Sequence, residues 1–177
     1  EIDGLRVVPA ANDSTAAAAA VALVRGGEVQ ALMKGHLHTD TLLRAVVDRQ
    51  SGLRRGRRLT HVFHMSLGGR FPPMLITDAA VNVAPDRATM RDIVLNAIDL
   101  ARALGDAVPR VALLSATEAA TSSVPSSVAA AELAAELARE TRAEIAGPLG
   151  FDCAVSPEAA RIKRVNGPVA GRAGVLV

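Results

Sequence analysis

Short apolar runs rich in β-branched residues alternate along this chain with longer segments that repeat apolar residues every three or four positions. Residues 110–116, RVALLSA, read as a buried strand, and the segment before them repeats at helical spacing from Met90 to Leu104. Asp86 can cap that helix and Gly105 can end it. Strands separated by helices form parallel sheets with helices on their faces, so the sequence predicts an α/β fold with a mostly parallel sheet.

The same alternation covers the rest of the chain, with one exception. We expect further strands at residues 5–10, 31–33, 59–67, 73–79, 143–146 and 174–177. We expect further helices from Asp13 or Ser14 to Arg25, from Thr39 to Gly52, over residues 125–140, and after Ser156-Pro157. The exception is the pair 59–67 and 73–79, which follow each other without a helix and predict an antiparallel hairpin.

The composition restricts the core and the partners. Aromatic residues make up 2% of the chain, so the core must be built from Ala, Val, Leu and Ile. The net charge of +2 is small and indicates no nucleic-acid partner. The single cysteine, Cys153, fits a reducing cytoplasm. The longest apolar run, residues 16–24, is too short to cross a membrane, so we expect no membrane partner.

A polar turn before the helix start at Thr39 has the features of an anion site. Gly35 lets the backbone approach a ligand closely, and the helix start offers unpaired N–H groups. Lys34 and Arg44 add positive charge, and the Arg44 side chain can reach back over the turn. The alternative is that Arg44 only pairs with Asp40 on the helix surface, while Thr39 or Asp40 serves as an ordinary N-cap or first-turn acid.

The histidines do not combine into a metal site. His36 and His38 flank this turn without an acidic or thiol partner nearby. His61 and His64 stand three apart in a predicted strand and therefore face opposite sides of it. The sequence predicts no bound metal.

Polar residues follow two of the predicted strands. Asp78 and Asn82 stand at a strand's carboxyl end, where ligands collect in open α/β sheets, or they bond their own backbone in a turn. Ser115 and Glu118 follow the next strand and either line a pocket or satisfy the turn. The basic run 53–58, LRRGRR, is either a patch for a polyanion or, as we favour, a solvated loop.

Six segments in order carry a family likeness: ALMKGHLHTDTLLRAV, LITDAAVNVAPD, NAIDLARALG, RVALLSATE, GPLGFDCAVSPEAARIK and PVAGRAGVLV. Together they resemble the phosphate acetyltransferase/phosphate butyryltransferase family. The likeness is greater to the butyryltransferase-like branch, including transferase modules fused to a hydratase, because Lys34 and His36 stand where the acetyltransferase branch prefers smaller residues. The resemblance implies reversible acyl transfer between coenzyme A and inorganic phosphate, with acyl-CoA and phosphate as substrates and no permanently bound cofactor.

The resemblance also implies an architecture of two α/β domains flanking a cleft, similar to the isocitrate/isopropylmalate dehydrogenases, in a homodimer. We accordingly expect a remnant of the first lobe at 1–50, the second lobe at 51–165, and a strand returning toward the first lobe at 166–177. The chain starts abruptly and stops inside an apolar strand, so we expect it to be part of a longer protein.

The resemblance assigns residues to the site. Arg44 falls on the arginine that the acetyltransferase branch places in its active-site cleft. The substrate-binding residues that we infer are Lys34, Gly35, His36, Thr39, Arg44, Asp78, Asp152 and Lys163. The base that activates the thiol in that branch lies downstream of the PVAG loop, so we expect it beyond Val177. Asn166 replaces the serine common before that loop, and Cys153, with apolar neighbours, is not expected to act as a nucleophile.

Two other classes of function stay open. One is an oxidoreductase on the related dehydrogenase fold, with Asp78 and Asp152 as metal ligands, although the chain lacks a tight carboxylate cluster and a GxGxxG turn. The other is a non-catalytic or truncated lobe that binds a ligand without turnover.

Overall fold

The computed structural model describes residues 4–66, 68 and 72–177 and divides into two compact units, Glu1–Leu59 and Thr60–Val177. The lobe boundaries that the sequence predicts, after residues 50 and 165, stay a prediction. The observed division follows the basic run 53–58, which lies in an exposed, irregular segment. The two units are described separately below.

Within residues 4–59, the first unit is built from the helices α1 (Asp13–Arg25) and α2 (Thr39–Val47). Asn12 caps α1 through reciprocal hydrogen bonds with Thr15, so the prediction that Asp13 or Ser14 caps this helix is wrong. Asn12 provides the same short acceptor side chain one position earlier. The second helix begins where predicted but ends five residues before Gly52.

Two strands predicted in the first unit do not form. Residues 5–10 are exposed throughout, and the Met33 side chain in the segment 31–33 is 98% exposed. A strand needs a neighbouring strand to pair its backbone N–H and C=O groups, and residues 4–59 contain no strand. Apolar composition was therefore not enough to make these segments β-structure.

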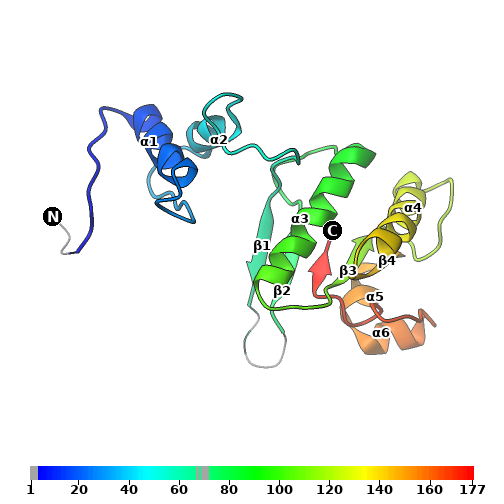
Figure 1. The fold of residues 1–177 in the computed structure, drawn as a ribbon. Coiled ribbons are helices and arrows are strands. Elements are labelled where there is room, and N and C mark those ends of the chain that lie inside the picture. Colours follow the sequence, from blue (N-terminus) through cyan, green and yellow to red (C-terminus); the bar gives the residue numbers. More distant parts are fainter. Residues whose placement is uncertain (1–3, 67, 69–71) are drawn as a thin grey trace. The chain divides into compact units, whose positions relative to one another are not determined.

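The second unit holds a five-stranded sheet in the order β1-β2-β5-β3-β4 (Figure 1). Its strands are β1 (Val62–Met65), β2 (Met74–Thr77), β3 (Arg110–Leu114), β4 (Glu144–Leu149) and β5 (Val175–Leu176). β1 and β2 form the predicted antiparallel hairpin, and every other neighbouring pair is parallel. The predicted α/β fold with a mostly parallel sheet is confirmed. The final strand pairs with β2 and β3 inside this unit. The predicted return of residues 166–177 toward the first lobe stays a prediction.

The helices of the second unit are α3 (Arg87–Ala103), α4 (Pro125–Glu140), α5 (Phe151–Val155) and α6 (Pro157–Ile162). The predicted caps Asp86 and Ser156 accept hydrogen bonds from backbone N–H groups three residues later, and Pro125 occupies the first turn of α4. The short α5 was not predicted, because it follows a Gly-Pro-Leu-Gly run typical of turns. In the described part of the chain, none of the helices combines the length and apolar content needed to cross a bilayer.

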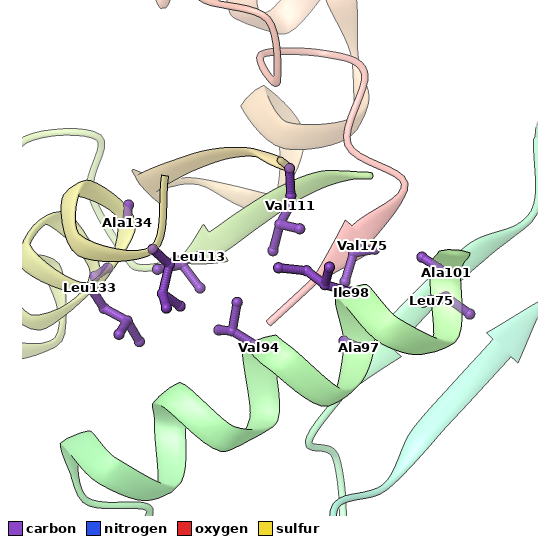
Figure 2. Close-up of a cluster of buried hydrophobic side chains, with 13 residues drawn as sticks. Leu75, Val94, Ala97, Ile98, Ala101, Val111, Leu113, Leu133, Ala134 and Val175 are labelled. Atoms are coloured by element: carbon purple, nitrogen blue, oxygen red, sulfur yellow. The ribbon is translucent and has the colours of Figure 1, made fainter. Parts of the chain in front are cut away.

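Alternate strand residues face two separate apolar clusters. Leu75, Val111 and Val175 pack with α3 and α4 on one face of the sheet, as Figure 2 shows. Ala112 and Leu176 belong to the other cluster, with α5 and the segment that leads into β5. Small aliphatic residues fill both clusters, as the composition predicted. At their carboxyl ends, β3 leads into the loop 115–124 and β4 leads through Gly150 into α5.

Candidate functional site

The anion turn, residues 34–39, is open and exposed. The Lys34 ammonium donates a hydrogen bond to the Leu37 carbonyl at 3.2 Å, and the Leu37 N–H donates to the Gly35 carbonyl at 2.9 Å. A Cβ built on Gly35 would meet no atom within 4 Å. The exposed predicted residues of this turn are Lys34, Gly35, His36 and Thr39. In the described structure α2 begins here without a side-chain cap, so its first N–H groups point to solvent or to a ligand.

Arg44 lies in the last turn of the nine-residue helix α2 and is exposed. Among the described residues it forms no ion pair with Asp40, so the helix-surface pair that we had considered as the alternative is not present. Its guanidinium therefore carries an unneutralised positive charge on the helix that the anion turn begins. The N-cap residue of this helix is His38, so neither Thr39 nor Asp40 caps it, but Asp40 is the acid of its first turn, as the alternative also allowed.

Asp78 is held by donors from its own surroundings. Its carboxylate accepts hydrogen bonds from the backbone N–H of His61 at 3.3 Å and of Val81 at 3.2 Å, and from the Asn82 side chain. Partial burial raises the pKa of Asp78, but these hydrogen bonds outweigh it, and the pKa lies below its ordinary value. The geometry matches the interpretation of Asp78 and Asn82 as turn residues. Their predicted role in ligand binding stays a prediction.

Four side chains meet at the carboxyl ends of β3 and β4, and we call them the carboxyl-end cluster. They are Glu118, Asp152, Cys153 and Lys163. The Lys163 ammonium donates hydrogen bonds to Glu118 Oε1 at 2.9 Å and to Asp152 Oδ1 at 3.2 Å. Glu118 follows β3, Asp152 lies in the first turn of α5, and Lys163 is the C-cap of α6. The structure thus brings together two predicted site residues and one predicted pocket residue.

The cluster leaves no space around the backbone at Gly150. A Cβ at this position would lie 2.7 Å from Glu118 Oε1 and 3.0 Å from Asp152 Oδ1. Cys153 is completely buried, and its sulfur lies within 4.8 Å of a carboxylate oxygen of Glu118 and of Asp152. The missing side chain of Gly150 is therefore a condition for the two carboxylates to converge on one lysine.

The charges of the cluster stabilise one another. Hydrogen bonds from Lys163 lower the pKa of Glu118 and of Asp152, and the same bonds raise the pKa of Lys163. Burial, followed by the contact with Glu118, raises the pKa of the Cys153 thiol, which therefore stays protonated at neutral pH. The cluster carries two negative charges and one positive charge. It offers no unpaired cation to a phosphate.

The donor atoms could also suit a metal ion, because Glu118, Asp152 and Cys153 each place one ligand atom within 4.8 Å of the others. The Lys163 ammonium, however, already lies against both carboxylates as a cation would. Asp78 is not a member of this group. The pair Asp78 and Asp152, which the dehydrogenase alternative needs as metal ligands, is therefore not brought together in the described groups.

Sequence reasoning singled out Glu118, Asp152 and Lys163 but not their contact. Lys163 and Glu118 are 45 residues apart in the chain, and the missed helix α5 supplies the link between them. The available signal was topological: both acids directly follow parallel strands, and the ends of adjacent parallel strands lie at the same side of a sheet.

Residues 6–177 match a protein family described as phosphate acetyl/butaryl transferase. A phosphate acetyltransferase of Rhizobium meliloti is 50% identical over 97% of this chain and 55% of its own length. A phosphate butyryltransferase of Clostridium acetobutylicum is 34% identical over 100% of this chain and 60% of its own length. These identities do not favour the butyryltransferase branch, although Lys34 and His36 had indicated it.

Solved structures show the same likeness. A branched-chain phosphotransacylase from Enterococcus faecalis has a TM-score of 0.87 and 39% identity, covering 96% of this chain and 61% of its own. A phosphotransacetylase from Streptococcus pyogenes has a TM-score of 0.74 and 27% identity, covering 92% and 50%. The chain spans about half the length of the curated relatives it matches, between 51% and 60% for those with full coverage of this chain.

Proposed function

This chain belongs to the phosphate acetyl/butaryl transferase family, and on that premise we propose that the whole protein is an enzyme that transfers an acyl group reversibly between coenzyme A and inorganic phosphate. The observation that carries the proposal is the family match over residues 6–177, together with relatives named for this reaction. The acyl groups that we propose range from acetyl to butyryl, because relatives named for both ends of that range match the chain.

The chemistry is nucleophilic substitution at a carbonyl. In the direction of acyl-CoA formation, a base takes the thiol proton of coenzyme A and the thiolate attacks the carbonyl carbon of the acyl phosphate. The new C–S bond forms, the C–O bond to the phosphate breaks, and inorganic phosphate leaves with the bonding electrons. No electrons are exchanged with a redox partner, so the reaction as proposed needs no resident cofactor.

We assign the binding of the phosphate group to the first unit. Arg44 can offer two parallel N–H donors to phosphate oxygens, a geometry that an ammonium does not provide. The anion turn adds the Lys34 charge, the accessible backbone at Gly35 and the first N–H groups of α2, with His36 and Thr39 at its margin. The supporting observation is that Arg44 has an unpaired charge, while Lys163 does not.

Asp78, Asp152 and Lys163 are proposed as residues of the second unit that support substrate binding. Their charges are met by neighbours within the chain, which favours a supporting role over direct contact with phosphate. We propose that the base is supplied by the part of the family protein beyond Val177, since the resemblance places it there. The same resemblance supports a two-lobed, dehydrogenase-like architecture, a homodimer and a cytoplasmic location for the whole protein.

The test is an acyl-transfer assay on two proteins: the 177-residue chain and a protein covering the full length of the relatives. Each is given acetyl-, propionyl- or butyryl-CoA with phosphate, and the release of free thiol is followed. We expect transfer by the longer protein and a rate lower by about 10²–10⁴-fold for the chain alone, the usual contribution of a general base.

Two other outcomes would change the proposal. Equal rates from both proteins would show that the base lies within this chain, with His36 as the first residue to test. No transfer by the longer protein with any of the three substrates would contradict the proposed activity. A ligand-binding lobe without turnover would then be the better interpretation.

A further inference from the structure

Lys163 connects three segments that are distant in the sequence. Its ammonium lies 2.9 Å from Glu118 in the loop before α4 and 3.1 Å from Asp152 in the first turn of α5. Lys163 itself ends α6. Within the described residues, the sequence holds one other lysine, Lys34, and it lies in the first unit. Among residues 4–66, 68 and 72–177, Lys163 is the only cation that forms an ion pair with either carboxylate.

The arrangement depends on that cation. Without it, two carboxylates with oxygen atoms within 4.8 Å of one another and of the Cys153 sulfur would face each other in a crowded space. Like charges at this distance repel, and both carboxylates lie close to the backbone at Gly150, where a Cβ would be 2.7 Å from Glu118 Oε1 and 3.0 Å from Asp152 Oδ1. Glu118 would then have to swing away from Asp152 and from the Cys153 sulfur, which lies within 4.8 Å of its carboxylate, and so uncover the thiol.

We propose that Lys163 is a positioning residue that ties Glu118 to Asp152 and so holds the loop 115–124 against α5. It acts on the site through these carboxylates and not by contact with phosphate. The loop it holds leads directly into α4, where Ser126 forms a hydrogen bond of 3.1 Å with Ser115 at the end of β3. The contacts of Lys163 therefore fix the carboxyl ends of the adjacent parallel strands β3 and β4 relative to each other.

Cys153 reports directly on whether Lys163 holds the two carboxylates together, because it is the only cysteine of the sequence and is completely buried. A neutral thiol reagent can modify it only when the surrounding segments open. We expect Lys163→Met to raise the rate of Cys153 modification by about threefold to tenfold, in line with the loss of a partly exposed ion pair and its coupling. The experiment uses the 177-residue chain and follows the modified mass over time at pH 7.

Three further variants make this result specific. The Lys163→Arg variant should be modified at Cys153 at nearly the wild-type rate, because a guanidinium can also bridge two carboxylates. The double variant Lys163→Met/Glu118→Gln should have a rate of Cys153 modification closer to the wild-type rate than Lys163→Met alone, because one of the two repelling charges is gone. Arg110→Gln removes the exposed Arg110–Glu144 pair elsewhere in the same unit and should leave the rate unchanged.

The inference is overturned if Lys163→Met leaves the modification rate unchanged, or if the double variant reacts as fast as Lys163→Met. A second arm rests on the proposed function and uses the longer protein. There, Lys163→Met should lower kcat while leaving the KM for phosphate unchanged, whereas a direct phosphate contact would raise that KM. Absence of acyl transfer in every protein would contradict the proposed function alone, because the thiol measurement needs no activity.

Discussion

The anion turn and the carboxyl-end cluster are both polar, glycine-containing turns next to a helix, yet their charges are arranged in opposite ways. In the anion turn, Gly35 faces open space and Arg44 has no ionic partner among the described residues. In the cluster, Gly150 is crowded by two carboxylates and Lys163 is shared between them. A cation without a partner can bind an incoming anion, whereas a cation already neutralised can only hold the fold together.

The largest expected effect concerns the apolar core between the sheet and the helices α3 and α4 of the second unit. Leu137 of α4 is fully buried, so Leu137→Ala should lower the free energy of unfolding by about 2–5 kcal/mol. Met33, beside the anion turn, is almost fully exposed, and Met33→Ala should change the free energy of unfolding by about 0.5 kcal/mol or less. Urea unfolding followed by circular dichroism measures both. Equal losses would show that the first unit is as tightly packed as the second.

The next effect sharpens the contrast between the two cations. In the longer protein, Arg44→Gln should raise the KM for phosphate or lower kcat/KM by about 10- to 100-fold, the usual worth of hydrogen bonds to a charged group. Arg49→Gln, which removes an exposed charge just after α2, is the matched control and should change neither constant appreciably. Steady-state kinetics with varied phosphate would detect the difference. Identical losses in both variants would point to general electrostatic attraction instead of a specific contact.

The two glycines allow a smaller test of the same contrast. Gly150→Ala places a methyl group against Glu118 and Asp152 and should cost about 1 kcal/mol of stability, because the carboxylates must move aside. Gly35→Ala meets no atom within 4 Å and should be tolerated. Thermal unfolding of the two variants provides the comparison. A destabilised Gly35→Ala variant would mean that the anion turn is more constrained than its open surroundings indicate.

The smallest effect is on the pH dependence of stability. The pKa values of Glu118 and Asp152 are lowered in the folded chain, so the unfolded chain binds protons more readily as the pH falls. Their contribution is therefore present above the ordinary carboxylate pKa and is lost as the pH falls through the folded values. Lys163→Met should make the free energy of unfolding fall less steeply between pH 5 and pH 3, as measured by urea titrations. An unchanged slope would show that the pair contributes nothing measurable at this exposed location.

Sequence patterns located most of the second unit. The apolar run 110–116 and the helical repeat before it were read correctly, because buried central strands and amphipathic helices leave strong periodic signals. The same logic failed at residues 31–33, where an apolar run has no strand to pair with. Whether a partner strand exists is a property of the whole unit and is not encoded in three residues.

The candidate site was predictable to a different extent in each region. The anion turn could be read locally, since a glycine, two cations and a helix start lie within a few residues. The carboxyl-end cluster required the sheet order, because Glu118 and Lys163 meet only once β3, β4 and α5 are in place. Gly150 illustrates the difficulty: its sequence neighbours indicate a turn, while its role follows from a carboxylate 32 residues earlier.

The two-residue strand β5 also affects how the second unit can be assembled during synthesis. It lies between β2 and β3, and it pairs Leu75 with Val175, one hundred residues later in the chain. As the polypeptide emerges from the ribosome, the edges of β2 and β3 that face β5 therefore keep unpaired backbone groups until almost the entire unit has been made. Such long-range pairing slows folding and exposes strand edges to other chains meanwhile. We expect refolding of this unit to be limited by the arrival of its last strand, with early stages that comprise the β1–β2 hairpin and the β3–α4–β4 segment.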